Sequence, residues 1–280
     1  MSDAGILYLV PTPIGNIDDI TERAKQVLAS VDLIAAEDTR HSQTLLRHLG
    51  IERKLVSIHE HNEQQKVAWV LEQLQQGHNI ALISDAGTPL ISDPGFIVVR
   101  ECRAKGFNVT ALPGACALTV ALSASGLATD RFCFEGFLPA KSGQRRKTLQ
   151  SLLNEPRTMI FYESPHRIVA SLEDLAAEFG NERQMVMGRE LTKQFETYLT
   201  GSIAEVIAQV NADSNQQRGE IVLLVAGCPN KSDDDAPSAE VIATLNVLRE
   251  ELPLKKAAAL TAKIHGARKN TLYQWAIEQQ

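Results

Sequence analysis

The sequence contains no run of about 18 apolar residues, the length that a membrane-spanning helix needs. Its first residues, MSDAGILYLVPTP, include an acid and only a short apolar run, which does not resemble a signal peptide. Only four cysteines occur, and they are scattered, with no CxxC spacing and no metal-ligand cluster with the seven histidines. We therefore expect a cytoplasmic protein with reduced thiols, no membrane association and no metal.

Several enzyme signatures are also missing. The sequence has no GxxxxGK[ST], HExxH or GxSxG, so a P-loop nucleotidase, a zinc protease of that class and a typical α/β-hydrolase are disfavoured. The first apolar run is followed by Pro11-Thr12-Pro13 instead of GxGxxG. Prolines remove backbone donors that a pyrophosphate requires at a helix N-terminus, so a dinucleotide site is disfavoured as well.

The composition is that of a globular protein with a mildly acidic surface. Of the 280 residues, 44% are hydrophobic and 22% charged, and the formal net charge is −6. The negative net charge argues against nucleic-acid binding over the whole surface, but it allows local basic patches. Two segments are locally basic: residues 141–147 with four positive charges, and residues 255–269 with five Lys or Arg and no acid.

Apolar runs and helix-like segments alternate along the first 112 residues, which predicts a mainly parallel sheet covered by helices. After a helix of small residues at 115–125, four more strands and three helices are expected. A polar, acidic stretch then precedes three short helices that resemble a helix-turn-helix unit. The predicted division is 1–114 and 115–228 as two α/β domains, 229–237 as a linker and 238–280 as a basic helical module. The expected strands are 6–10, 31–36, 55–58, 80–83, 109–112, 132–137, 158–162, 184–187 and 219–225, and the expected late helices are 144–153, 165–179, 202–210, 239–251, 254–264 and 270–278.

The segment IALISDAGTPLISDPG, residues 80–95, is the most informative in the chain. A buried strand ends at Ser84, and a loop with two Ser-Asp pairs, two prolines and two glycines follows. Loops at the carboxyl ends of strands are where open α/β sheets bind ligands, so this loop is predicted to hold a small molecule. A structural alternative remains for Asp93, which is suitably placed to be a helix N-cap with Pro94 in the first turn.

Other polar loops follow predicted strands at residues 11–16, 36–40, 59–62, 161–167 and 188–193. Their convergence on one cleft is the usual geometry of an α/β active site. Each loop also has a structural interpretation: Asp38 or Thr39 caps the next helix, Ser164 caps the helix begun by Pro165, and Arg189 and Glu190 pair with each other or with neighbours.

These loops resemble those of the tetrapyrrole methylase superfamily, which uses S-adenosylmethionine without a Rossmann fold, and within it the bacterial ribosomal RNA small subunit methyltransferase I family. The resemblance is carried by the segments LVPTPIGN, AAEDTR, SDAGTPLISDPG, LPGACA, FYESPHR and GRELTK, spread over most of the first 225 residues. It implies a homodimer of two α/β domains with the cofactor in the cleft between them. One departure is Pro11-Thr12-Pro13, where tetrapyrrole enzymes have a glycine-rich loop, so their substrate contacts are not transferred.

The resemblance implies 2′-O-methylation of the ribose of a cytidine in the decoding region of 16S rRNA, in naked or assembled form. It also implies S-adenosyl-L-methionine contacts from Asp85, Ala86, Gly87, Pro89, Ile91, Ser92, Asp93, Ala115, Cys116, Ala117, Phe161, Tyr162 and Leu191.

A ribose hydroxyl is a weak acid, so a base or a cation near the reacting oxygen is expected. The candidate bases are Glu37, Asp38, Glu60, Glu163 and Glu190, and the candidate cations are Arg40, Arg189 and Lys193. RNA phosphates are expected to contact basic residues beside the cleft and in the tail. These are Lys141, Arg145, Arg146, Lys147, Lys255, Lys256, Lys263, Arg268 and Lys269. Two alternatives are a methyltransferase of the same superfamily acting on a tetrapyrrole or a protein side chain, and a non-catalytic RNA-binding protein.

Overall fold

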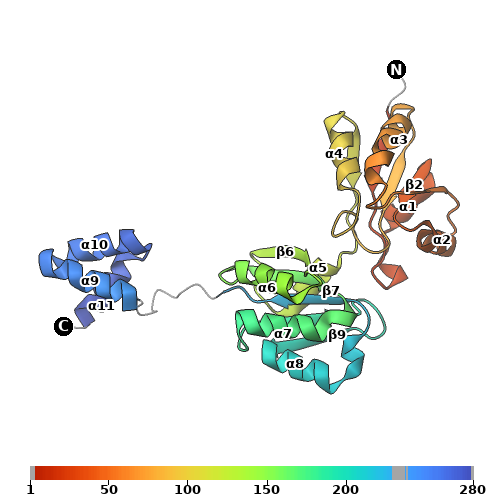
Figure 1. Ribbon diagram of the computed structural model, residues 1–280. Coiled ribbons are helices and arrows are strands. Elements are labelled where there is room, and N and C mark those ends of the chain that lie inside the picture. Colours follow the sequence, from red (N-terminus) through yellow and green to blue (C-terminus); the bar gives the residue numbers. More distant parts are fainter. Residues whose placement is uncertain (1–3, 229–236, 238, 279–280) are drawn as a thin grey trace. The chain divides into compact units, whose positions relative to one another are not determined.

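The computed structural model describes residues 4–228, 237 and 239–278, and it forms two compact units, Met1–Gly227 and Cys228–Gln280 (Figure 1). Within those ranges no helix combines the length and apolarity needed to cross a membrane. The first unit contains two five-stranded sheets, one before and one after the predicted boundary at residues 113–117. The exact domain limits stay predictions, and most of the predicted linker, 229–236, lies outside the described residues.

The first sheet is parallel throughout, as the alternation of strands and helices predicted, with strand order β3-β2-β4-β1-β5. The connection that leaves β1 runs towards β2 on one side of the sheet order, whereas the connection that leaves β4 runs towards β5 on the other side. The connections therefore switch direction between the neighbouring parallel strands β1 and β4. Such a switch point is where open α/β sheets leave a crevice for ligands. The strands are β1 (Ile6–Leu9), β2 (Leu33–Ala36), β3 (Lys54–Ser57), β4 (Ile80–Ile83) and β5 (Asn108–Ala111), and the helices are η1 (Ile17–Asp19), α1 (Glu22–Ser30), α2 (Thr39–His48), α3 (Glu63–Gln75) and α4 (Phe96–Ala104).

The second sheet is mixed, with order β6-β7-β10-β8-β9, and only β6 and β7 run parallel. Its edge strand β9 was not predicted, whereas the other four strands agree with the expected ranges to within two residues. The strands are β6 (Phe132–Phe137), β7 (Thr158–Glu163), β8 (Gln184–Arg189), β9 (Thr197–Ser202) and β10 (Ile221–Val225). The helices are α5 (Ala117–Ser125), α6 (Ser142–Ser151), η2 (Pro165–Arg167), α7 (Ile168–Phe179), α8 (Ile203–Ala212) and η3 (Ser214–Gln217).

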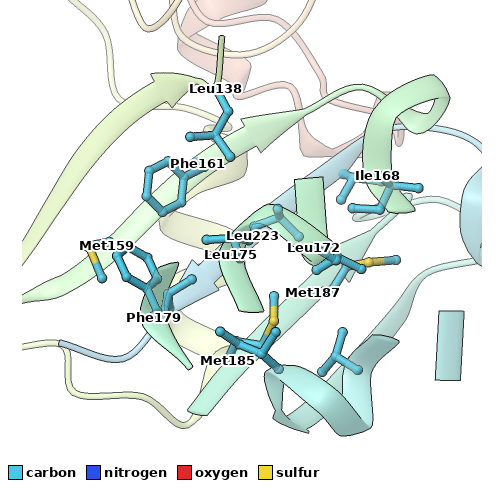
Figure 2. Packing of buried hydrophobic residues seen from close by; sticks show 14 of the residues in the cluster. Leu138, Met159, Phe161, Ile168, Leu172, Leu175, Phe179, Met185, Met187 and Leu223 are labelled. Carbon is cyan, nitrogen blue, oxygen red and sulfur yellow. The ribbon is translucent and has the colours of Figure 1, made fainter. Parts of the chain in front are cut away.

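Each sheet has an apolar cluster on both of its faces, as expected for sheets covered by helices. The larger cluster of the second sheet packs α7 and α8 onto β7, β8 and β10. Figure 2 shows its close packing, with Phe161 of β7 near Leu138 and with Leu172 and Leu175 contributed by α7. The opposite face packs against α5, whose small residues bring that helix close to the strands.

The second unit contains α9 (Ala239–Glu251), α10 (Leu254–His265) and α11 (Lys269–Glu278), which confirms the three predicted helices. They pack around a small core of Leu245, Ala257, Ala258, Leu272 and Ala276. The turn between α10 and α11 contains Gly266 with φ of 64°, the left-handed conformation in which glycine often ends a helix.

Candidate functional site

A cavity of about 470 Å³ lies in the first unit, within the size range of small-molecule sites. Its wall includes residues of the loops that follow β1, β2 and β4 in the first sheet and residues from β6, β7 and β10 of the second sheet, so segments far apart in the sequence meet there. The lining residues are Ile14, Glu37, Asp85, Ala86, Gly87, Thr88, Ile91, Ser92, Asp93, Cys116, Ala117, Phe137, Tyr162, Glu163, Ser164, Pro165, Leu191, Gly219, Glu220, Ile221 and Val222.

Residues 84–95, the loop between β4 and α4, contribute more lining residues than any other segment, namely 85–88 and 91–93. The loop is joined to the turn after β1 by a pair of backbone hydrogen bonds between Thr12 and Gly87, with lengths of 2.9 and 3.1 Å. Thr88 Oγ1 donates to the carbonyl of Ala115 over 2.9 Å and so ties the loop to the start of the second half. The loop is therefore fixed at the switch point between β1 and β4.

Gly87 shows why a glycine is needed in this loop. Its φ is 82°, and an added Cβ would lie 3.1 Å from Ile14 Cγ2 and 3.6 Å from the carbonyl oxygen of Ala115. A side chain at Gly87 would therefore both strain the backbone and press on another lining residue.

Asp93 does not cap a helix, so the predicted N-cap role was wrong. Helix α4 begins at Phe96, with Gly95 at the N-cap position and a φ of 124°. Asp93 instead lines the cavity, and its Oδ2 is buried without a hydrogen-bond partner among the described residues. Burial, reinforced by the negative charges of Glu37 and Asp85 and opposed by Ser84, raises the pKa of Asp93 to about 6.

The charged residues in the cavity wall are all acidic: Glu37, Asp85, Asp93, Glu163 and Glu220, with no Lys, Arg or His among the lining residues. Asp85 is oriented by the backbone N–H of Asp38, which donates to Asp85 Oδ1 over 3.1 Å. Partial burial and the charge of Asp85 raise the pKa of Glu37. Because Glu163 and Glu220 pair with Arg167 and Lys193 outside the wall, the uncompensated carboxylates are those of Glu37, Asp85 and Asp93, and these favour a ligand that carries positive charge.

Tyr162 connects the cavity to α5. Its hydroxyl accepts a hydrogen bond of 3.2 Å from the backbone N–H of Leu118, in the first turn of that helix. Burial raises the pKa of Tyr162, which keeps the phenol neutral. The rings of Phe134 and Phe137 pack edge-on against Tyr162 at centroid distances of 4.8 and 5.6 Å, so the tyrosine has a fixed orientation.

Ten of the thirteen residues predicted to contact the cofactor line this cavity. The other three are Pro89, Ala115 and Phe161. Pro89 is buried within the loop, Ala115 contributes its carbonyl to Thr88, and the side chain of Phe161 is fully buried in the core of the second sheet (Figure 2).

Among the predicted bases and cations, only Glu37 and Glu163 line the cavity. The carboxylate of Glu163 is already engaged. Its Oε1 accepts from the Ser164 N–H and from Arg167, and its Oε2 accepts from Ser171 over 2.5 Å. The carboxylate of Glu37, by contrast, accepts no hydrogen bond from the described residues, so Glu37 is the candidate base that is free to receive a proton.

Arg189, Glu190 and Lys193 lie beside the cavity, and their hydrogen bonds connect residues 189–193 with residues 195–197 and 216–220. Arg189 is buried, and its guanidinium donates to Thr197, Gln216 and two carbonyls. Lys193 pairs with Glu190 at 2.7 Å and Glu220 at 3.0 Å. Burial alone would raise the pKa of Glu190, but hydrogen bonds from Lys193 and the Glu220 amide outweigh it and lower that pKa.

Three further candidates lie outside the cavity wall. Asp38 caps α2 by accepting from the N–H of Arg40 over 2.8 Å, and the hydrogen bond from the Arg40 side chain lowers the pKa of Asp38. The Arg40 side chain is 90% exposed, and Glu60 is exposed as well. The predicted helix cap at Asp38 is therefore confirmed, whereas Ser164 precedes η2 without a side-chain capping bond.

The basic residues of α6 differ in their exposure. The guanidinium of Arg145 is almost fully buried and pairs with Asp174 of α7 at 2.6 Å, so it is not available to a phosphate. Lys141, Arg146 and Lys147 are exposed, although Arg146 pairs with Glu178. In the second unit, exposed residues include Lys255, Lys256, Lys263, Arg268 and Lys269.

Sequence reasoning missed nine lining residues. Some had a readable signal, because Ile14, Thr88, Ser164 and Pro165 lie inside loops already singled out. The residues of β10 and the turn before it had none, since only the antiparallel pairing of β10 with β7 and β8 brings them to the cavity. The missed residues are Ile14, Thr88, Phe137, Ser164, Pro165, Gly219, Glu220, Ile221 and Val222.

The family model for tetrapyrrole (corrin/porphyrin) methylases matches residues 6–207, and the model for the RsmI C-terminal HTH domain matches residues 235–280. The chain is 56% identical over 276 residues to "Ribosomal RNA small subunit methyltransferase I" of Escherichia coli, covering 99% of this chain and 96% of that protein. The protein of the same name from Haemophilus influenzae is 55% identical, with coverage of 98% and 96%. A uroporphyrin-III C-methyltransferase from Thermus thermophilus, solved with S-adenyl homocysteine, has a TM-score of 0.56 at 17% identity, covering 79% of this chain and 97% of that one, which shows a shared fold.

Proposed function

The chain belongs to the tetrapyrrole methylase family and, within it, to the ribosomal RNA small subunit methyltransferase I proteins, and from this premise we propose that it methylates 16S rRNA with S-adenosyl-L-methionine as methyl donor. The reaction proposed is 2′-O-methylation of the ribose of a cytidine in the decoding region. The observation that carries the proposal is the 56% identity to a named rRNA methyltransferase over 99% of the chain.

The cavity suits this donor on chemical grounds. S-adenosyl-L-methionine carries a sulfonium, an ammonium and one carboxylate, so its net charge is positive, and the charged groups of the wall are all carboxylates. Oδ2 of Asp93 is a buried acceptor without a hydrogen-bond partner among the described residues, so it is available to a donor group of the ligand. We assign the cofactor contacts to the lining residues of the loop 84–95 together with Cys116, Ala117, Tyr162 and Leu191.

The bound donor supplies an electrophilic methyl group, and the protein's part is mainly to orient the attacking oxygen. Glu37 is our candidate for taking the proton from the ribose hydroxyl, because its carboxylate lies in the wall, is free of hydrogen bonds and has a raised pKa that favours accepting a proton. Glu163 acts indirectly: it holds Arg167 and Ser171 and thereby fixes the segment 163–165 of the wall.

The RNA is proposed to contact exposed basic residues. Lys141, Arg146 and Lys147 on α6 are candidates, as are the lysines of α10 and α11 in the unit that matches the RsmI C-terminal HTH domain. A cytoplasmic location accompanies this proposal, since the proposed substrate is part of the bacterial ribosome, and a homodimer is proposed from the resemblance to the family alone.

One experiment tests the proposal against its alternatives. The protein is incubated with methyl-labelled S-adenosylmethionine and, in separate reactions, naked 16S rRNA, assembled small subunits or a tetrapyrrole. We expect label in the rRNA, at a ribose 2′-oxygen, and none in the tetrapyrrole. Label in the tetrapyrrole alone, or in neither RNA substrate, would refute the proposal.

A further inference from the structure

The loop 84–95 is held unevenly along its length. Its first part is fixed by hydrogen bonds of Ser84, Gly87 and Thr88. Among the described residues, the amides from 89 to 95 donate one backbone hydrogen bond, from Ile91 to the Thr88 carbonyl over 3.4 Å. Yet this part includes Leu90 and Ser92 in the left-handed region, with φ of 72° and 65°. Strained backbone of this kind persists only where surrounding structure fixes it.

The end of the loop is fixed from another helix. Gly95, at the N-cap position of α4, has no side chain to satisfy the first amides of the helix. The carboxylate of Glu63 does so instead. Its Oε1 accepts from the N–H of Ile97 over 2.7 Å and from the N–H of Val98 over 3.1 Å. Glu63 is the first residue of α3, so it joins the N-termini of two helices.

Because Glu63 is buried, its contact with the N-terminus of α4 resists displacement. Glu63 is 5% exposed and forms no ion pair with a described residue, so the amides and the dipole of α4 are its compensation. A shift of α4 would leave a bare carboxylate in the interior. The loop end also has little room, because a Cβ on Gly95 would lie 2.7 Å from Leu82 Cδ2 and 3.0 Å from Leu90 Cδ1.

We propose that Glu63 is a positioning residue for the cofactor cavity: by fixing the N-terminus of α4 it sets the path of residues 89–95, including Ile91, Ser92 and Asp93 in the cavity wall. The inference rests on the proposed function, since the ligand concerned is S-adenosylmethionine. Glu63 does not touch that ligand, and its effect passes through the backbone of the loop.

The test measures S-adenosylhomocysteine binding by calorimetry in the full-length chain. Glu63→Ala is expected to weaken binding at least tenfold and to speed hydrogen exchange at the amides of Ile97 and Val98. Glu63→Gln keeps an acceptor oxygen at the same reach and is expected to bind within about threefold of the wild type. If the alanine variant does not fold, Glu63→Asp replaces it, because it withdraws the acceptor by one methylene and is expected to weaken binding as well.

Ser202→Ala is the matched control. Ser202 caps α8 by accepting from the N–H of Glu205, far along the chain from the loop, so its loss lowers thermal stability without altering the cavity wall. We expect Ser202→Ala to retain wild-type affinity. Wild-type affinity in Glu63→Ala or Glu63→Asp, or a glutamine variant no better than alanine, would overturn the inference. A wild-type protein that binds no S-adenosylhomocysteine would refute the proposed function instead.

Discussion

At the scale of single residues, Asp93 and Gly87 both line the cavity. Asp93 was assigned by pattern to a helix cap, yet α4 begins two residues later than that pattern requires. The reason is non-local: the acceptor for the first amides of α4 comes from Glu63, which leaves Asp93 free to face the cavity. The need for glycine at position 87 was predictable from the sequence, whereas the contact partner Ile14 was not.

The raised pKa of Asp93 predicts pH-dependent binding. With a pKa of about 6, roughly a tenth of Asp93 is ionised at pH 5 and nearly all at pH 7.5, and a cationic ligand needs the ionised form. We expect S-adenosylmethionine to bind about tenfold more weakly at pH 5 than at pH 7.5, as measured by calorimetry. Asp93→Asn should remove most of this dependence. Equal affinities of the wild type at the two pH values would contradict the role of Asp93.

The same pKa predicts the stability of the ligand-free protein. The folded state holds the Asp93 proton up to about pH 6, whereas the unfolded chain releases it near the ordinary aspartate pKa of about 4. Folding therefore loses stability as the pH rises from about 4 to 6. Asp93→Asn should stabilise the protein at pH 8 by about 1 kcal/mol, a value reduced for partial solvent exposure, and by nothing near pH 3.5. Urea unfolding at both pH values measures the difference, and an equal effect at both would contradict the account.

Gly87→Ala separates backbone strain from cavity geometry. We expect it to cost about 1–2 kcal/mol of stability, because alanine resists a φ of 82°, and to weaken S-adenosylhomocysteine binding about tenfold through the contact with Ile14. Gly50→Ala is the control, since Gly50 has a φ of 68° but nothing within 4 Å of the added Cβ. Calorimetry should show weaker binding for Gly87→Ala alone. Similar affinities for both variants would show that position 87 does not shape the site.

At the scale of elements, the sequence predicted the strands and helices well and their partners less well. Hydrophobic runs such as Ile80–Ile83 are buried on both faces, and their pattern identifies them without further information. Strand β9 was not predicted because the segment Thr197–Ser202 is polar, half-buried and at a sheet edge. Pairing is also non-local, which is why the contribution of β10 to the cavity could not be predicted.

The Arg145–Asp174 ion pair between α6 and α7 tests whether Arg145 has a structural role instead of the predicted RNA-binding role. Arg145→Met removes a nearly fully buried guanidinium and leaves the Asp174 carboxylate, which is 13% exposed, with the Ser142 hydroxyl as its remaining donor, so it should cost about 3 kcal/mol of stability. The neighbouring Arg146→Met removes a guanidinium that is 49% exposed and should cost clearly less stability than Arg145→Met. Chemical denaturation measures both values. An Arg145 variant as stable as the Arg146 variant would contradict the structural role given to Arg145.

At the scale of the whole molecule, the two units differ in charge. The first unit contains an acidic cavity, and the second has exposed basic residues on α10, on α11 and in the turn between them. A net charge of −6 hides this contrast, and only the local patches predicted it. The resemblance to methylases identified the class of ligand, because composition and spacing alone led only to an unnamed small molecule.

The role of the second unit is tested by replacing Lys255, Lys256, Lys263 and Lys269 with glutamine. We expect rRNA affinity to fall at least tenfold and the dependence of log affinity on log salt to become shallower by up to about 4, roughly one for each lost phosphate contact. S-adenosylhomocysteine binding should not change. Filter binding at several salt concentrations measures the slope, and an unchanged affinity and slope would show that these lysines do not bind RNA.

The central claim is that the cavity between residues 84–95 and β10 binds the methyl donor, and a crystal structure of the full chain grown with S-adenosylhomocysteine tests it most directly. The account predicts the ligand inside this cavity, with Asp93 Oδ2 accepting a hydrogen bond from it and the loop 84–95 along one side. Saturating ligand bound at any other place, with the cavity empty, would contradict the account.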